Sequence, residues 1–330
     1  MRKYFVYWLI FSIIGVGDSF ASSLDITYRG YGISIGNSKR INGIRFNLVD
    51  NGVERINGLN LTFWKPKDNP DAVINGFAFG LVAPAAKELN GLALGGVAVA
   101  GEKINGVAFG TIGLASDTMR GIAIGGIGMA CESIDGIAFG SVGLADWSIN
   151  GIAIGGVGLA SESVNGISLG GVGLAAGNIN GIAIGGIGLA SENMNGISLG
   201  GVGLAAGNIN GIAIGGIGLA SKTINGISLG GIGVAAEEIK GVTIGGLGVG
   251  ARRITGFTIG GMRAKCNSLT GLVVGGYCQV ERRLTGVSIG IFNWTTHLNG
   301  VQIGVLNYCR NNPKFFRWLP IVNVHIDREG

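Results

Sequence analysis

Few residues in this chain are of the types that carry out chemistry, and they lie far apart. Among 330 residues there are two histidines, His297 and His325, and both follow residue 296. A Ser–His–Asp triad or a histidine metal site needs a histidine close to its partners, so neither arrangement is expected. We predict no catalytic residue, no metal ligand and no bound cofactor, and we expect that the chain is not an enzyme.

The four cysteines form no recognisable metal or disulfide framework. They are Cys131, Cys266, Cys278 and Cys309. None stands in the close Cys-x-x-Cys spacing of zinc sites, so we interpret them as small hydrophobic residues. Only Cys266 and Cys278 lie near each other in the sequence, and whether these two form a disulfide is left open.

Glycine is the most unusual feature of the composition, with 66 residues against 5 prolines. The mean hydropathy of +0.48 argues against a disordered chain, which would lack apolar surface to bury. No apolar run of about 20 residues follows the N-terminus, which argues against membrane-spanning helices. Segments such as Gly155-Gly156-Val157-Gly158 resemble phosphate-binding loops superficially, but no lysine and helix follow them.

The glycines belong to a repeat of 15 residues. From Asn75-Gly76 to Gly286 a dipeptide ending in Gly returns at fourteen consecutive intervals of 15 residues, and weaker copies begin at Asn42 and Asn57. A further copy stands at Asn299. Such regularity predicts a repeat architecture.

One repeat, residues 151–165, alternates apolar and small residues, but the phase of the alternation changes across Gly155-Gly156. A flat strand keeps alternate side chains on one face, so a bend is expected at the glycine pair, where glycine would supply positive φ angles. The repeat then forms one coil of a parallel β-solenoid, with columns of Ile, Leu, Asn and Gly. We predict Ile and Leu inside, and Ala153, Gly158, Ser161 and Ser163 outside.

The alternative is an antiparallel up-and-down β-barrel in the outer membrane. Coils reading Gly-Ile-Ala-Ile alternate with coils reading Gly-Ile-Ser-Leu, as strands of opposite direction would. Two observations count against the barrel. Loops of outer-membrane barrels vary in length, whereas the repeat spacing here is constant. Such barrels also carry girdles of aromatic residues, whereas the only aromatic residues in 92–250 are Phe109, Phe139 and Trp147. We therefore favour the solenoid.

The ends of the chain differ from the repeats. Residues 1–21 are typical of a signal peptide, with Arg2 and Lys3, an apolar stretch and a small-x-small site ending at Ala21. We predict an N-terminal cap with irregular repeats over residues 22–75, a regular solenoid over 76–300 and a C-terminal cap over 301–330. A solenoid needs such caps because open end coils expose unpaired backbone. The aromatic residues of 315–318 are interpreted as capping, or alternatively as a membrane or partner contact.

Charge is distributed unevenly along the chain. Residues 101–240 carry four basic and nine acidic residues, whereas residues 241–330 carry ten basic and three acidic ones. The basic C-terminal region suggests contact with envelope or host surface molecules or anionic glycans, and the plainer interpretation is solubility. The partner itself is unknown, and no nucleic-acid binding is expected.

One position of the repeat, eleven residues after each glycine, is often charged. Glu102, Asp117 and Glu132 occupy it in successive coils, and further along Glu237 is followed by Arg252. Stacked carboxylates would repel unless solvated or bridged by a cation, and we expect a solvated turn. Glu237 and Arg252 are expected to be a favourable pair.

The repeat Asn-Gly-Ile-Ala-Ile-Gly-Gly and the ending Asn299-Gly-Val-Gln-Ile-Gly-Val-Leu-Asn307 resemble the surface repeat-containing proteins of leptospires and other bacteria. The resemblance implies export and a location on the bacterial cell surface or in the outer membrane, and it implies no activity. We therefore expect an exported, non-enzymatic surface protein with a structural, adhesive or scaffolding role. An outer-membrane pore is the alternative, and a glycan-active β-helix enzyme is a remote one.

Overall fold

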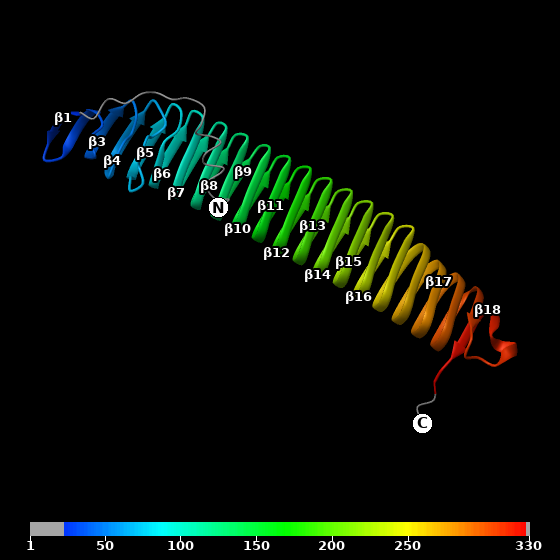
Figure 1. The fold of residues 1–330 in the computed structure, drawn as a ribbon. Helices are drawn as coiled ribbons and strands as arrows, with labels where there is room; N and C mark the ends of the chain where they lie inside the picture. The colour runs from blue at the N-terminus through cyan, green and yellow to red at the C-terminus, as the bar shows by residue number, and fades with distance from the viewer. Residues whose placement is uncertain (1–22, 328–330) are drawn as a thin grey trace. The chain divides into compact units, whose positions relative to one another are not determined.

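The structure is a computed structural model that describes residues 23–327 (Figure 1). The expected signal peptide, residues 1–21, lies outside the described residues. The chain divides into two compact units, residues 1–161 and 162–330. Within residues 23–327 the polypeptide forms almost only β-strands in both units, and the single helical element there is a short 3-10 turn, η1 (Lys314–Phe316).

Each regular coil contributes one long strand that ends at the glycine pair. The strands of the first unit are β1 (Ser23–Tyr28), β2 (Tyr31–Gly36), β3 (Arg40–Asn47), β4 (Arg55–Thr62), β5 (Val73–Gly80), β6 (Ala85–Gly95), β7 (Ala98–Gly110), β8 (Gly113–Gly125), β9 (Gly128–Gly140) and β10 (Gly143–Gly155). The unit boundary falls within β11 (Gly158–Gly170). The strands of the second unit are β12 (Gly173–Gly185), β13 (Gly188–Gly200), β14 (Gly203–Gly215), β15 (Gly218–Gly230), β16 (Gly233–Gly245), β17 (Gly248–Cys309) and β18 (Trp318–His325).

Successive coils pair in parallel and in register. In the first unit Ile152 lies opposite Ile137, and in the second unit Ile197 lies opposite Ile182, so each residue faces its equivalent 15 positions away. This arrangement is a parallel β-solenoid, as predicted. The antiparallel barrel is wrong, because neighbouring strands of an up-and-down barrel run in opposite directions and these repeat strands of residues 40–260 do not.

Antiparallel pairing occurs only beside the first and last described strands. In the first unit β1 pairs antiparallel with β2 through a tight turn at Arg29 and Gly30, both of which have positive φ. In the second unit β18 runs antiparallel to residues 300–308 of β17. Each of these strands covers backbone groups that an end coil would otherwise leave unpaired.

The core of each coil differs from the sequence prediction in which side chains point inward. Leu159 and Val164 are buried as predicted, but Ala153 is buried as well, and Ile152 and Ile154 lie on its outer side, half-exposed. The predicted outward column is thus an inner column of small residues: Ala153, Ser168, Ala183, Ser198, Ala213, Ser228, Thr243 and Thr258. The remaining predictions for this coil are also not met fully, since Gly158, Ser161 and Ser163 are half-buried rather than exposed.

The alternation of one continuous strand, β10, explains this reversal. Positive φ occurs at the glycine of the Asn-Gly dipeptide, Gly151, and not at Gly155 or Gly156 as predicted for the bend. The alternation nevertheless runs unbroken through Gly151, with Ile149 and Ala153 inside and Asn150 and Ile152 outside, and the chain bends at Gly156 and Val157, beside the predicted glycine pair. At Gly155 a Cβ would overlap the carbonyl oxygen of Gly158, three residues further on across this bend, so the backbone there has no room for a side chain.

Candidate functional site

The most extensive surface feature of the second unit is a set of outward aliphatic columns. We define the aliphatic face as the first, third and sixth positions after the repeat glycine in the ten coils that begin between Gly166 and Gly300. Every residue at these positions is Ile, Leu, Val, Phe, Met or Tyr. Exposure is 36–42% in the first column from Ile167 to Ile227, and 44–53% in the sixth from Val172 to Leu247. Large apolar patches of this kind mark interaction surfaces.

A ladder of asparagine amides borders the aliphatic face. In the second unit Nδ2 of Asn180 donates to Oδ1 of Asn165 at 2.9 Å, and Asn195, Asn210 and Asn225 continue the series at 2.8–3.0 Å. The first unit has the same ladder from Asn42 to Asn105 at 2.6–2.8 Å. Because each amide bonds its equivalent in the next coil, the predicted asparagine column is confirmed, and it fixes the register of the stack.

The residues considered for chemistry remain dispersed. His325 contacts Asn312 through Nδ1 at 2.6 Å and Asp327 through Nε2 at 3.4 Å, whereas His297 is exposed. No group of three or more His, Cys, Asp or Glu side chains that could hold a metal is found among residues 23–327. Neither histidine therefore belongs to such a group in this part of the chain.

The four cysteines are buried and unbridged. The sequence left a Cys266–Cys278 disulfide open, and in the structure both are free thiols. Burial raises the pKa of the Cys266 thiol to about 12 and that of Cys278 to about 11. Burial also raises the pKa of Cys131 and of Cys309. Thiols of this kind hold little thiolate at neutral pH and are poor nucleophiles.

In the charged column, which lies eleven residues after each glycine, an acidic side chain of one coil pairs with a basic side chain of the next toward the C-terminal end. Arg252 lies 3.7 Å from Glu237, which confirms the predicted pair, and in the adjoining column Arg253 lies 2.9 Å from Glu238. Glu102 and Asp117 are exposed and Glu132 is half-buried. The column is therefore a solvent-facing edge, as expected.

One carboxyl group is buried within a coil of the first unit. Asp146 occupies the inner position that Ser116 and Cys131 hold in earlier coils, and its side chain is nearly inaccessible. Burial raises the pKa of Asp146 to about 7, although the backbone N–H groups of Trp147 and Ser148 donate to Oδ1 at 2.6 and 3.2 Å. Its Oδ2 has no partner among the described residues.

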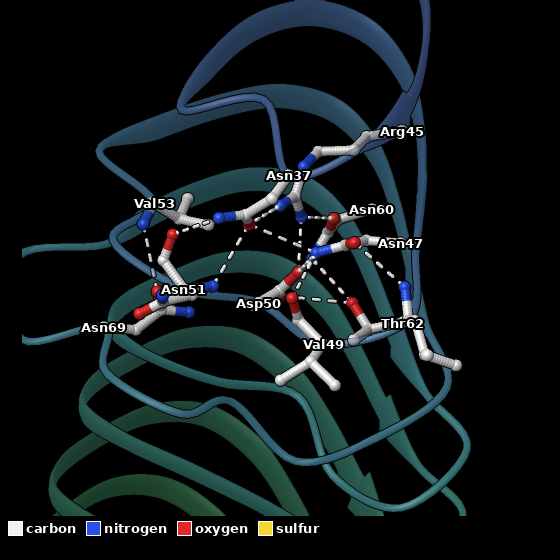
Figure 2. A network of polar contacts seen from close by, with 11 residues as sticks. Asn37, Arg45, Asn47, Val49, Asp50, Asn51, Val53, Asn60, Thr62 and Asn69 are labelled. Atoms are coloured by element: carbon white, nitrogen blue, oxygen red, sulfur yellow. Dashed lines mark hydrogen bonds and ion pairs between the residues drawn. The ribbon is translucent and has the colours of Figure 1, made fainter. Parts of the chain in front are cut away.

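A buried ion pair forms the centre of a polar network in the first unit (Figure 2). Arg45 and Asp50 are both fully buried and joined through Nη1 and Oδ1. Arg45 also donates to Asn60 at 2.8 Å and to Asn37 at 2.7 Å. Asp50 accepts from Asn60 at 3.0 Å and from Thr62 at 3.1 Å. Arg45 Nε has no hydrogen-bond partner among the described residues, but Nη1, Nη2 and both carboxylate oxygens of Asp50 are bonded within the network, which therefore closes the core rather than offering a ligand site.

The sixth-position column of the second unit ends in stacked aromatic rings. Tyr277 and Phe292 have ring centroids 5.0 Å apart, and Trp318 from β18 continues the stack at 5.9 Å. The guanidinium of Arg263 lies 5.5 Å from the Tyr277 ring centroid. The ring faces contact each other, so they are not free to stack on a ligand. Phe315, considered for capping or contact, is 94% exposed.

Sequence reasoning missed both the aliphatic face and the Arg45 network. The signal for the network was present, because Arg45 and Asn60 interrupt the column that continues as Ala78. The signal for the face was that the second and fourth positions after each glycine both hold small residues. Small residues at alternate positions are expected inside a narrow coil, which leaves the larger residues of the first and third positions outside. Periodicity alone does not say which alternate set points inward.

Comparison with protein-family models, curated proteins and solved structures found no match to this chain. Among residues 23–327 there is no helix of the length and hydrophobicity needed to cross a membrane.

Proposed function

We propose that this chain is an exported, non-enzymatic repeat protein of the bacterial surface with a structural, adhesive or scaffolding role. One observation supports the proposal most directly: successive coils present the same outward side chains in register, as in the asparagine ladder and the aliphatic columns. Repeat proteins use such extended surfaces to contact partners. Export is supported by the signal-like composition of residues 1–21.

Export is tested by expressing the chain with its own N-terminus in a bacterium. We expect cleavage after Ala21, read by N-terminal sequencing, and labelling of intact cells by a membrane-impermeant amine reagent. A matched variant lacking residues 2–21 is expected to stay unlabelled in the cytoplasm. An uncleaved full-length chain that stays inside the cell would overturn the proposal.

A second candidate function, adhesion to anionic glycans, rests on the basic residues of the second unit. Arg252, Arg253, Lys265 and Arg283 pair with carboxylates, whereas Arg282, Arg310 and Lys314 are exposed without a carboxylate partner among residues 23–327. Replacing these last three by Ala is expected to lower retention on a sulfated polysaccharide column at low salt. Arg253→Ala is the control, and equal retention of both variants would exclude this role.

A further inference from the structure

The aliphatic face of the second unit is an apolar surface that no other segment of the described residues covers. Its three columns contain no charged or amide side chain in any of the ten coils. Ile197 at 38% exposure and Ile217 at 49% exposure are typical members. A soluble monomer rarely leaves a patch of this extent in water, because apolar area in contact with solvent is unfavourable.

We propose that the aliphatic face is a self-association surface, which binds the same face of a second copy of this chain. This inference goes beyond the proposed function and does not depend on export. An isologous contact of this kind requires the same patch on both subunits and a two-fold axis between them.

The size of the face matches what a stable dimer needs. Five residues of chain span at most about 16 Å, since the strand ends two residues before the sixth position, and successive coils lie about 4.8 Å apart, so each coil adds up to roughly 80 Å². The ten coils of the second unit therefore offer up to roughly 800 Å², which is the area that one partner contributes to a standard interface. The core of such an interface is apolar and its rim is polar, and here the asparagine ladder supplies a polar rim.

Charge distinguishes a second copy from a lipid bilayer as the occupant. Two copies of an uncharged face meet without like-charge repulsion. Surfaces that lie on anionic membranes carry Lys or Arg beside the apolar residues and Trp or Tyr at the interface. The rim here reads Asn165, Asn180, Asn195, Asn210 and Asn225 before a single base, Lys240, and the columns of residues 166–255 contain no aromatic side chain. Aromatic residues enter the columns only at Phe257, Tyr277 and Phe292, and the last two stack on each other.

The spacing of the columns also suits contact with an identical face. Each column repeats at the strand spacing because equivalent residues pair directly, as Ile212 does with Ile197 and with Ile227. Two such faces have the same repeat distance, so the side chains of one can enter the gaps of the other along the whole contact. This is the geometry by which paired sheets exclude water.

The test uses the full mature chain in detergent-free buffer, with its mass followed by light scattering over a concentration series. We expect twice the mass of one chain, and at least a tenfold weaker dimer when Ile182→Lys and Ile212→Lys are combined. Glu192→Lys changes the net charge by the same amount outside the three columns, and it should leave the dimer unchanged. A chain that is monomeric at all concentrations, or that binds vesicles of anionic lipid as a monomer, overturns the proposal.

A second measurement covers the case in which the lysine variant does not fold. Ile212→Cys places one accessible thiol on the aliphatic face, since the native cysteines are buried. Its labelling by a maleimide is expected to slow at least tenfold as protein concentration rises, because the partner covers it. Glu192→Cys serves as the exposed control. Labelling of the Ile212→Cys thiol that is independent of concentration would overturn the proposal.

Discussion

At the scale of single residues, two glycines of β13 show how strictly position decides what the coil tolerates. A Cβ on Gly196, where φ is +123°, would overlap the carbonyl oxygen of Gly181 in the preceding coil. A Cβ on Gly188 would meet no heavy atom within 4 Å. The equivalent of Gly196 is glycine in every regular coil, whereas the equivalent of Gly188 is Ala98 or Arg263 in other coils, so only the first is required by the backbone.

We expect Gly196→Ala to destabilise the protein by at least about 2 kcal/mol, from the strain of a positive φ and the overlap with backbone. Gly188→Ala should change stability by less than about 1 kcal/mol, with a gain from reduced unfolded-state entropy. Urea unfolding followed by far-ultraviolet circular dichroism measures both. Equal losses for the two variants would contradict the backbone argument.

The buried carboxyl of Asp146 predicts a stability that changes with pH. Its folded pKa, about 7, lies above the ordinary value of 3.8, so the folded state binds the proton more tightly than the unfolded state. The contribution of protonated Asp146 is therefore complete below about pH 4 and is lost as pH rises to about 7.

We expect Asp146→Ser, which restores the residue type of Ser116 and Ser161 at this inner position, to raise the melting temperature at pH 8. The gain should shrink as pH falls toward 5, where the wild-type carboxyl is mostly protonated. Differential scanning calorimetry between pH 5 and 8 measures this. A variant whose gain does not depend on pH would show that Asp146 is charged throughout. Glu192→Ser, at an exposed position, serves as the control for a lost charge.

At the scale of elements, the sequence was sufficient to predict the strands and their stacking. It was not sufficient to predict which side chains of each strand point into the core. The 15-residue spacing determined that Ile152 lies beside Ile137, because identical coils stack most favourably in register. The direction of Ala153 was not determined by the pattern. It follows from the unbroken alternation of β10, which places Ala153 on the same face as the buried Ile149, and from the close approach of Gly155 to Gly158 at the bend, which are properties of the folded coil. The aliphatic face could not be predicted until these were known.

The first-unit network offers a comparison between a buried and an exposed ion pair in neighbouring segments. Arg45 and Asp50 have no accessible side-chain surface, whereas Arg40 and Glu54 are 78% and 44% exposed. We expect Arg45→Ala to cost about 3–5 kcal/mol, because Asp50 is left charged and buried. Arg40→Ala should cost about 0–1 kcal/mol.

Hydrogen exchange is the suitable measurement for these two variants. Loss of the buried pair should increase exchange in β3 and β4 first, since each coil of a solenoid is supported mainly by its neighbours. Arg40→Ala is expected to leave those strands protected. Unchanged protection in the Arg45→Ala variant would mean that the network contributes no stability.

At the scale of the whole molecule, the repeat makes stability a sum over neighbouring coils, and the end strands acquire a separate role. Every interior coil has its backbone groups paired on both sides. The strand over residues 300–308 is different, because its outer side is covered by β18. Trp318 of β18 also stacks on Phe292 and contacts the Tyr308 ring in a tilted arrangement. Removing β18 would expose a long unpaired edge next to aromatic side chains.

We therefore expect a chain that ends at residue 317 to assemble through this edge into larger β-rich species, because unpaired strand edges recruit further strands. The experiment is best done in the Ile182→Lys and Ile212→Lys background, where association through the aliphatic face is weakened and only the edge remains. Sedimentation velocity and thioflavin fluorescence follow the assembly. Phe315→Ala, which alters an exposed residue of η1 and retains β18, should show none. If the shortened chain keeps the sedimentation coefficient of a single chain, β18 does not protect the edge, and the last coil must be shielded by its own side chains.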